Sequence, residues 1–243
     1  MSALFFIAAF TAYFIKGLSG FANTIVFTTM LSLKTDNINI SPLEILIAYP
    51  SDIIIAVKFR KKIMWKECVK LAILLIAGAF PGIFFLKNGN PALVKCILGL
   101  TVIVVGIDLL LADKRKKDEA NPALLMVIGI ASGILCGMFG IGALLASYVG
   151  RTTKDTESFK ANMNVLFAVD GTMRIIMYAA NGMITEKMLW YALKLMPCMV
   201  VGLLIGIQLA KKLPDKLVRK IIIIMLIGMG LVILATVLAS FLQ

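Results

Sequence analysis

Apolar residues dominate the chain in long blocks that short polar segments separate. Most blocks have about 16 to 24 residues, the length that an α-helix needs to cross the ~30 Å hydrocarbon core of a bilayer at ~1.5 Å per residue. The pattern therefore predicts transmembrane helices. We expect full spans near residues 42–57, 69–86, 93–112, 162–181, 189–210 and 219–241.

Two further apolar blocks, at 3–33 and 122–149, have a different form because glycines interrupt each of them near its middle. The first block is too long for one span, and an arm of about 15 residues reaches only ~22 Å. Either each block crosses the membrane as one long kinked helix, or its two arms form a re-entrant hairpin that enters and leaves by the same face.

Matching motifs recur in the two halves of the chain. Residues 16–23 (KGLSGFAN) align with residues 136–143 (CGMFGIGA) at an offset of 120. Gly78 and Gly82 align with Gly202 and Gly206 at an offset of 124, and a Lys–x–x–Trp motif recurs at an offset of 125. The sequence therefore predicts two repeats, 1–112 and 121–243, joined by a charged linker at 113–120.

Loop charge decides between the hairpin and the kinked helix. In the hairpin arrangement the loops around 58–70, 113–119, 150–160 and 211–220 share one side, and they hold most of the 25 Lys and Arg residues. The kinked-helix arrangement distributes these loops over both sides. Because basic loops favour the cytoplasm, the hairpin arrangement is preferred.

Three spans and one hairpin give each repeat an odd number of crossings, so the second repeat is inverted relative to the first. The predicted fold class is an all-α polytopic membrane protein of two inverted repeats, each a glycine-broken re-entrant hairpin followed by three transmembrane helices. We expect a multi-pass protein of the cell membrane, with its basic loops and linker in the cytoplasm and both termini outside.

Composition narrows the function classes. Hydrophobic residues make up 60% of the chain and charged residues 16%, and the mean hydropathy is +0.98, which is typical of a bilayer protein and not of a soluble domain. The net charge of +12 lies mainly in short loops, so it indicates topology and not a nucleic-acid partner. The sequence has no His and no CxxC pair, and we expect no metal site, no cofactor and no catalytic residues.

The two glycine-broken segments are the predicted binding site. Irregular backbone at membrane depth persists only where protein or a watery cavity satisfies its polar groups. The N-terminus of each second arm offers free N–H groups and the positive end of a helix dipole, which attract anions. Alternatively, these glycines only allow close helix packing. The predicted substrate-binding residues at the breaks are Lys16, Gly17, Ser19, Gly20, Asn23, Thr24, Gly137, Gly140 and Gly142.

Charged residues inside apolar segments complete the predicted site. Arg174 is predicted to bind the anion, and Lys16 adds a second cation at the first break. Asp52 and Asp170 are predicted coupling or ion-pair residues. Asp170 and Arg174 are four residues apart on one helix, so they form either a structural pair or part of a functional site.

The sequence resembles the sulfite exporter TauE/SafE family, also called TSUP, over nearly its whole length. The resemblance rests on KGLSGF from Lys16, GMFGIG from Gly137, FRKKIMW from Phe59 before AFPG, and GLLIG from Gly202 before the last basic loop. The family often carries three consecutive glycines in these hairpins, where this chain has Phe21-Ala22-Asn23. The resemblance implies secondary transport of sulfite, organosulfonates or related sulfur-containing anions.

The leading hypothesis is therefore an anion transporter that works by alternating access, with a small anion and the lipid bilayer as partners. A homodimer is compatible with the sequence. An anion channel of the same architecture and a non-transporting scaffold or sensor subunit are the alternatives. A membrane-embedded enzyme is disfavoured because no Cys–His or clustered carboxylate constellation is present, and no GxxxxGK[ST] motif indicates a nucleotide.

The topology is tested by cysteine accessibility in a variant whose four native cysteines are replaced. Single cysteines at positions 90 and 215 should be labelled from opposite faces of oriented vesicles. Labelling of both positions from the same face would exclude the hairpin arrangement.

Overall fold

The computed structural model describes residues 3–111, 122–153, 155–210, 212 and 215–241, and over these residues every regular element is a helix. The predicted all-helical class is thus confirmed. The elements are α1 (Ala3–Ser19), α2 (Asn23–Ser32), α3 (Asn37–Lys58), the 3-10 turn η1 (Arg60–Lys62), α4 (Trp65–Asn88), α5 (Pro91–Leu111), α6 (Pro122–Phe139), α7 (Ala143–Thr152), α8 (Thr156–Ala180), α9 (Glu186–Ala210) and α10 (Asp215–Phe241).

Helices α3, α4, α5, α8, α9 and α10 coincide with the six stretches predicted as spans. Within the described residues, α3, α4 and α9 are long and apolar enough to cross a membrane by length and composition. Helix α1 and parts of α5 and α6 are shorter apolar helices. The number of crossings stays a prediction, and the predicted linker at 113–120 lies outside the described residues.

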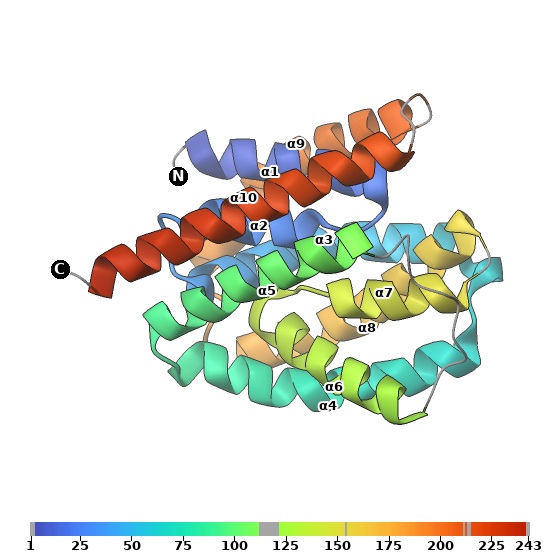
Figure 1. Cartoon of the computed structure of the whole chain (residues 1–243), viewed down its shortest axis with the longest axis horizontal. Coiled ribbons are helices and arrows are strands. Elements are labelled where there is room, and N and C mark those ends of the chain that lie inside the picture. The colour runs from blue at the N-terminus through green and yellow to red at the C-terminus, as the bar shows by residue number, and fades with distance from the viewer. Residues whose placement is uncertain (1–2, 112–121, 154, 211, 213–214, 242–243) are drawn as a thin grey trace.

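Helices of the first half pack mainly against helices of the second half, an arrangement that we call exchanged packing. Helix α1 packs on α9 and α6 packs on α4, while α3 packs on α8 and α5 on α10. Matching α1–α5 in order with α6–α10 converts the α1–α9 pair into the α6–α4 pair and maps each of the other two pairs onto itself. Figure 1 shows the pairs side by side, with α4 and α6 along one edge and α1, α9 and α10 along the other.

Glycines let the exchanged pairs approach closely. A Cβ atom at Gly206 would collide with the backbone oxygen of Phe14 on α1, and one at Gly82 would collide with that of Ile134 on α6. Gly82 and Gly206 are 124 residues apart, and Phe14 and Ile134 are 120 apart, so the same contact forms at both aligned positions. Small residues bring helices into van der Waals contact in this way in membranes, where apolar association alone provides little drive.

The chain turns back after α1 and again after α6 (Figure 1), and the two breaks begin with the same local geometry. Gly20 and Gly140 have φ values of 87° and 74°, in the left-handed region that favours glycine. Each donates its N–H to the carbonyl four residues earlier, that of Lys16 or Cys136, at 2.7 Å. Both α1 and α6 therefore end with a C-terminal glycine cap at aligned positions.

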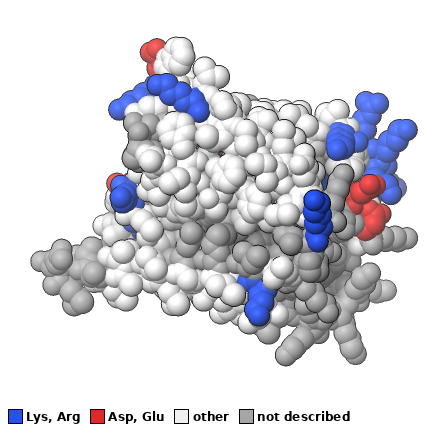
Figure 2. All heavy atoms as spheres, turned by 90° about the horizontal axis from the view of Figure 1, so that it is seen from above, with Lys and Arg blue, Asp and Glu red and all other residues white. Residues whose placement is uncertain are grey.

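Charged side chains gather at the two ends of the molecule and leave an apolar belt between them (Figure 2). Large apolar side chains are exposed on the described surface: Phe84 is 71% exposed and Val127 66%. The start of α1 and the end of α10 lie at one end of the long axis, and η1 with the start of α4 lies at the other (Figure 1). An apolar belt bounded by charged ends is the surface expected of a protein embedded in a bilayer.

The close helix contact at Gly206 generates a stability prediction. Gly206→Ala should lower the free energy of unfolding by about 1–3 kcal/mol, because the new methyl group overlaps the Phe14 carbonyl. The measurement is thermal unfolding of the purified protein in detergent. Gly228→Ala on α10 is the matched control: nothing lies within 4 Å of its Cβ position, and alanine improves helix propensity. Equal melting temperatures for the two variants would contradict the proposed contact.

Candidate functional site

Five Lys, Arg, Asp and Glu side chains lie deep inside the described part of the molecule. They are Lys16 on α1, Glu44 and Asp52 on α3, and Asp170 and Arg174 on α8, and each residue is at most 3% exposed. Burying charge in an apolar protein is costly, and such residues within membrane segments mark substrate or ion pathways by default. The cluster is therefore the candidate functional site.

Lys16 forms an ion pair with Asp52. Its Nζ lies 2.7 Å from Oδ1 of Asp52 and donates a second hydrogen bond of 2.7 Å to Oγ of Ser51, whose hydroxyl in turn donates to the carbonyl of Ala48. Lys16 lies in the last turn of α1, directly before Gly17, and its side chain reaches across to α3. Its charge is thus compensated within the protein.

Arg174 lies between the two other carboxylates. Its Nη1 is 3.7 Å from Oδ2 of Asp170, the partner expected from the four-residue spacing, and its Nη2 is 4.0 Å from Oε2 of Glu44. Nε donates to the hydroxyl of Tyr178 at 3.3 Å. Neither Nη2 of Arg174 nor Oε2 of Glu44 has a hydrogen-bond partner among the described residues. The guanidinium therefore keeps an unused donor beside an unused carboxylate oxygen.

The side chain of Glu44, from α3, lies at the N-terminus of α2. Its Oε1 accepts hydrogen bonds from Nδ2 of Asn23 at 3.0 Å and from Oγ1 of Thr24 at 2.6 Å, both in the first turn of that helix. The N-cap residue of α2 is Ala22, whose methyl side chain cannot accept a hydrogen bond from the helix. The position at which the helix dipole favours negative charge, where we expected a bound anion, is thus next to a carboxylate of the protein itself.

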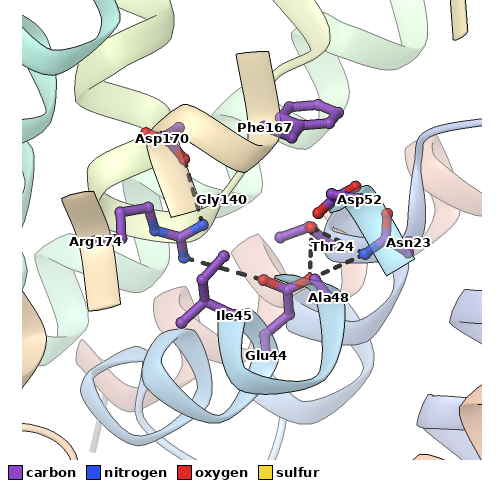
Figure 3. Close-up of a pocket in the computed structure, with 10 residues that line it drawn as sticks. All are labelled: Asn23, Thr24, Glu44, Ile45, Ala48, Asp52, Gly140, Phe167, Asp170 and Arg174. Carbon is purple, nitrogen blue, oxygen red and sulfur yellow. Dashed lines mark hydrogen bonds and ion pairs between the residues drawn. The ribbon is translucent and has the colours of Figure 1, made fainter. Parts of the chain in front are cut away.

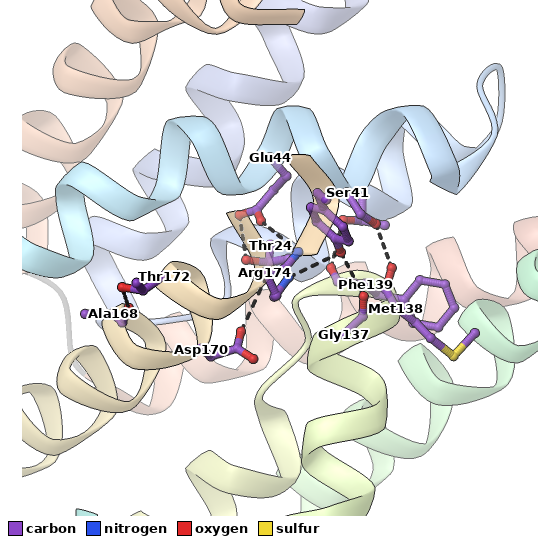
Figure 4. A network of polar contacts seen from close by, with 12 residues as sticks. Thr24, Ser41, Glu44, Gly137, Met138, Phe139, Ala168, Asp170, Thr172 and Arg174 are labelled. Atoms are coloured by element: carbon purple, nitrogen blue, oxygen red, sulfur yellow. Dashed lines mark hydrogen bonds and ion pairs between the residues drawn. The ribbon is translucent and has the colours of Figure 1, made fainter. Parts of the chain in front are cut away.

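The carbonyl groups that end α6 are satisfied by hydroxyl groups from other helices (Figure 4). Tyr178 donates to the carbonyl of Gly137 at 2.7 Å, and Ser41 donates to that of Met138 at 2.7 Å. Thr28 approaches the carbonyl of Phe139 at 3.5 Å. These bonds meet the requirement for broken backbone in an apolar surrounding, and they join the second break to α2, α3 and α8.

A small pocket lies between the two breaks (Figure 3). Its space is about that of one water molecule. The guanidinium of Arg174 and the carboxylate of Glu44 face each other across it, and Phe167 closes its far side. The lining residues are Asn23, Thr24, Glu44, Ile45, Ala48, Asp52, Gly140, Phe167, Asp170 and Arg174.

Six of the residues predicted from the sequence line this pocket: Asn23, Thr24, Asp52, Gly140, Asp170 and Arg174. Gly140 is packed against the guanidinium, because a Cβ there would approach Nη1 of Arg174 to 2.7 Å. A glycine at this position therefore lets the arginine reach the turn of the second break. The pocket lining thus includes residues of both breaks, and its polar side chains come from the first break, α3 and α8.

The other predicted residues lie beside the pocket and not in its lining. Lys16 reaches it only through Asp52. Gly17 faces the backbone of α9 and Gly137 that of α4, which are close-packing roles. The hydroxyl of Ser19 donates to the carbonyl of Ile15.

Gly20 and Gly142 are each in contact with one side chain. A Cβ at Gly20 would meet Lys160, and one at Gly142 would meet the ring of Phe167. Gly142 thus leaves room for an aromatic ring that lines the pocket, whereas Gly20 lies outside it.

The sequence analysis missed Glu44 and Tyr178. Glu44 lies inside the predicted span 42–57, so the criterion that selected Asp52 applies to it equally. Tyr178 carries no charge, and its place between Arg174 and the Gly137 carbonyl depends on tertiary packing that no local pattern encodes.

The apolar belt, the broken helices and the buried charged cluster define an integral membrane protein of the transporter class. The profile of the sulfite exporter TauE/SafE family matches residues 5–233, and the chain belongs to this family. Members of this family are membrane exporters and not enzymes, in agreement with the prediction from the sequence.

One curated relative is the "Probable sulfite/organosulfonate exporter TauE" of Cupriavidus necator, strain H16. It is 22% identical to this chain over 171 residues, which cover 68% of this chain and 66% of the relative. No solved structure matches the chain significantly.

The Lys16–Asp52 pair generates a prediction about stability. Lys16→Met should destabilise the protein by about 3–5 kcal/mol, because it leaves the Asp52 carboxylate buried without a counter-charge. Lys16→Met combined with Asp52→Leu removes both charges and should recover most of this loss. The measurement is a double-mutant cycle by thermal unfolding in detergent. Additive effects of the two substitutions would show that the pair is not coupled.

Proposed function

We propose that this protein is a secondary transporter that moves sulfite, an organosulfonate or a related sulfur-containing anion across the cell membrane by alternating access. Membership of the TauE/SafE family and the printed function of the relative from C. necator support the substrate class. The observation that carries the assignment to a site is the unused Nη2 donor of Arg174, buried at the pocket between the two breaks.

The anion binds to the guanidinium of Arg174 at this pocket. A planar guanidinium donates two parallel hydrogen bonds to an oxyanion, and sulfite and sulfonate groups present such oxygen pairs. The first turn of α2 adds the positive end of its dipole, while its side chains Asn23 and Thr24 hold Glu44 beside the pocket. Substrate recognition therefore combines one cation with a helix dipole.

The pocket is too small for a sulfonate, so the structure corresponds to a contracted state with the site closed. A space of about one water molecule must widen before a group of several heavy atoms can enter. Binding then requires a shift of α2, α3 or α8 relative to the second break. A site that opens only through such a shift suits alternating access better than a continuous anion channel.

The membrane topology that accompanies this mechanism is the inverted repeat. Each half contributes one re-entrant hairpin, α1–α2 or α6–α7, followed by three spanning helices. The exchanged packing of the two halves, the matching glycine caps and the placement of the terminal helix ends opposite η1 all support it. In this arrangement the η1 end is cytoplasmic and both termini lie outside.

Ligand-dependent stabilisation tests the proposed function. At a concentration of about 100 times Kd, sulfite or methanesulfonate should raise the stability of the detergent-purified protein by about 2.7 kcal/mol, measured as an upward shift in melting temperature. Arg174→Gln should remove this shift, while Lys194→Gln, which deletes an exposed cation on α9, should keep it. Stabilisation by cations alone, or an undiminished shift with Arg174→Gln, would refute the proposal.

A further inference from the structure

We propose that Glu44 is the proton-binding residue of this transporter and that each monovalent anion crosses the membrane together with one proton. This inference rests on the proposed anion transport and adds its coupling ion. It starts from the unequal number of charges in the buried cluster, which holds three carboxylates but only two cations among the described residues.

Two of the carboxylates already have a cation of their own. Asp52 accepts a charged hydrogen bond from Lys16 at 2.7 Å, and Asp170 lies 3.7 Å from Arg174 on the same helix turn. Glu44 shares Arg174 with Asp170 and is farther from it, at 4.0 Å. Glu44 therefore has the most distant counter-charge of the three carboxylates, in a place where water screens little.

The hydrogen bonds of Glu44 leave one oxygen ready for a proton. Oε1 accepts two hydrogen bonds, from Asn23 and Thr24, whereas Oε2 accepts none and faces the pocket beside Arg174 (Figure 3). A proton on Oε2 disturbs neither of these bonds. The pocket itself has the space for a water molecule that delivers or removes the proton.

The other groups that face Glu44 do not replace it in this role. They are Tyr13 and Lys16 on α1, Asp52 on its own helix, Cys136 on α6, and Asp170, Arg174 and Tyr178 on α8. The two phenols and the thiol are neutral near pH 7 by their ordinary acidity. From α2, the nearest helix, the facing side chains of Asn23 and Thr24 are uncharged.

Anion binding and protonation are coupled because both act on the attraction between the Glu44 carboxylate and the Arg174 guanidinium. The proton removes the charge of Glu44, and the anion takes its place beside Arg174. In the empty site the Glu44 carboxylate faces Arg174, and an incoming anion would add a second unpaired negative charge at the same guanidinium. When Oε2 takes up a proton from a hydronium ion at the open face, an O–H bond of that ion breaks, one to Oε2 forms, and the carboxylate becomes neutral. Arg174 is then free to bind the anion. After the site opens to the other side, the anion leaves, the O–H bond breaks and the proton passes to water there.

The experiment measures the number of protons that accompany each anion. Purified protein reconstituted in vesicles is given radiolabelled methanesulfonate, whose own charge does not change near neutral pH, and a pH-sensitive dye reports proton movement. The wild-type protein should move about one proton with each anion. Glu44→Gln, which preserves the size of the side chain and an acceptor for Asn23 and Thr24, should lower this ratio at least to about a tenth, whatever the remaining anion flux.

Two control variants show whether Glu44 carries the proton. Glu186→Gln removes an exposed carboxylate on α9 and should keep the wild-type ratio. Asp170→Asn removes the other carboxylate beside Arg174, so we expect its anion flux to change, but each anion that crosses should still carry about one proton. Proton movement that disappears in Asp170→Asn and persists in Glu44→Gln would overturn the assignment to Glu44.

Failure of this inference is distinguishable from failure of the proposed function. Methanesulfonate flux without accompanying protons in the wild-type vesicles overturns the proton coupling and leaves the transporter assignment intact. Absence of flux for both sulfite and methanesulfonate overturns the transporter assignment, and this inference falls with it. Because Glu44→Gln could also unfold the chain, its melting temperature is measured beside that of the wild type, and proton uptake on anion binding to the folded protein in detergent provides the second readout.

Discussion

The central physical constraint in this protein is the need to compensate charges and broken backbone that are buried away from water. Five Lys, Arg, Asp and Glu side chains and two glycine-broken turns meet in the same interior region. Each carbonyl that ends α6 near the site finds a hydroxyl, and Lys16 finds Asp52. Among the buried polar atoms left without a hydrogen-bond partner, one guanidinium nitrogen of Arg174 and one carboxylate oxygen of Glu44 face each other across the pocket. The proposed chemistry of anion and proton follows from these two atoms.

The helical fold could be predicted from the sequence because spans and repeats leave strong one-dimensional signals. The lengths of the apolar blocks identified the helices, and the repeat offsets of 120 and 124 paired glycines that prove to make equivalent contacts at Phe14 and Ile134. Loop charge and length also indicated the hairpin form of the first blocks. Which end of the molecule faces the cytoplasm stays a prediction, since it rests on loop charge alone.

The site was only partly predictable from the sequence. Intramembrane charge identified Arg174, Asp52 and Asp170, but the roles of individual cations depend on which partner the tertiary packing brings to them. Lys16 appeared as an anion ligand from its place at the break, yet its Nζ is engaged by Ser51 and Asp52. At the 120-residue offset Glu44 corresponds to Asn164, so a buried carboxylate in one repeat stands where the other has a neutral amide. The repeats share a scaffold but divide the chemistry unequally.

The exchanged helix packing has a consequence for biosynthesis. Helix α1 leaves the ribosome long before its close partner α9, because more than 160 residues separate the two helices. Until α9 is inserted, the surface of α1 around Phe14 and Gly17 faces lipid or a helper protein and not its final neighbour. The first half therefore cannot complete its own packing while it is being synthesised. Folding must finish after translation of the second half, when α6 has packed against α4 and α9 against α1.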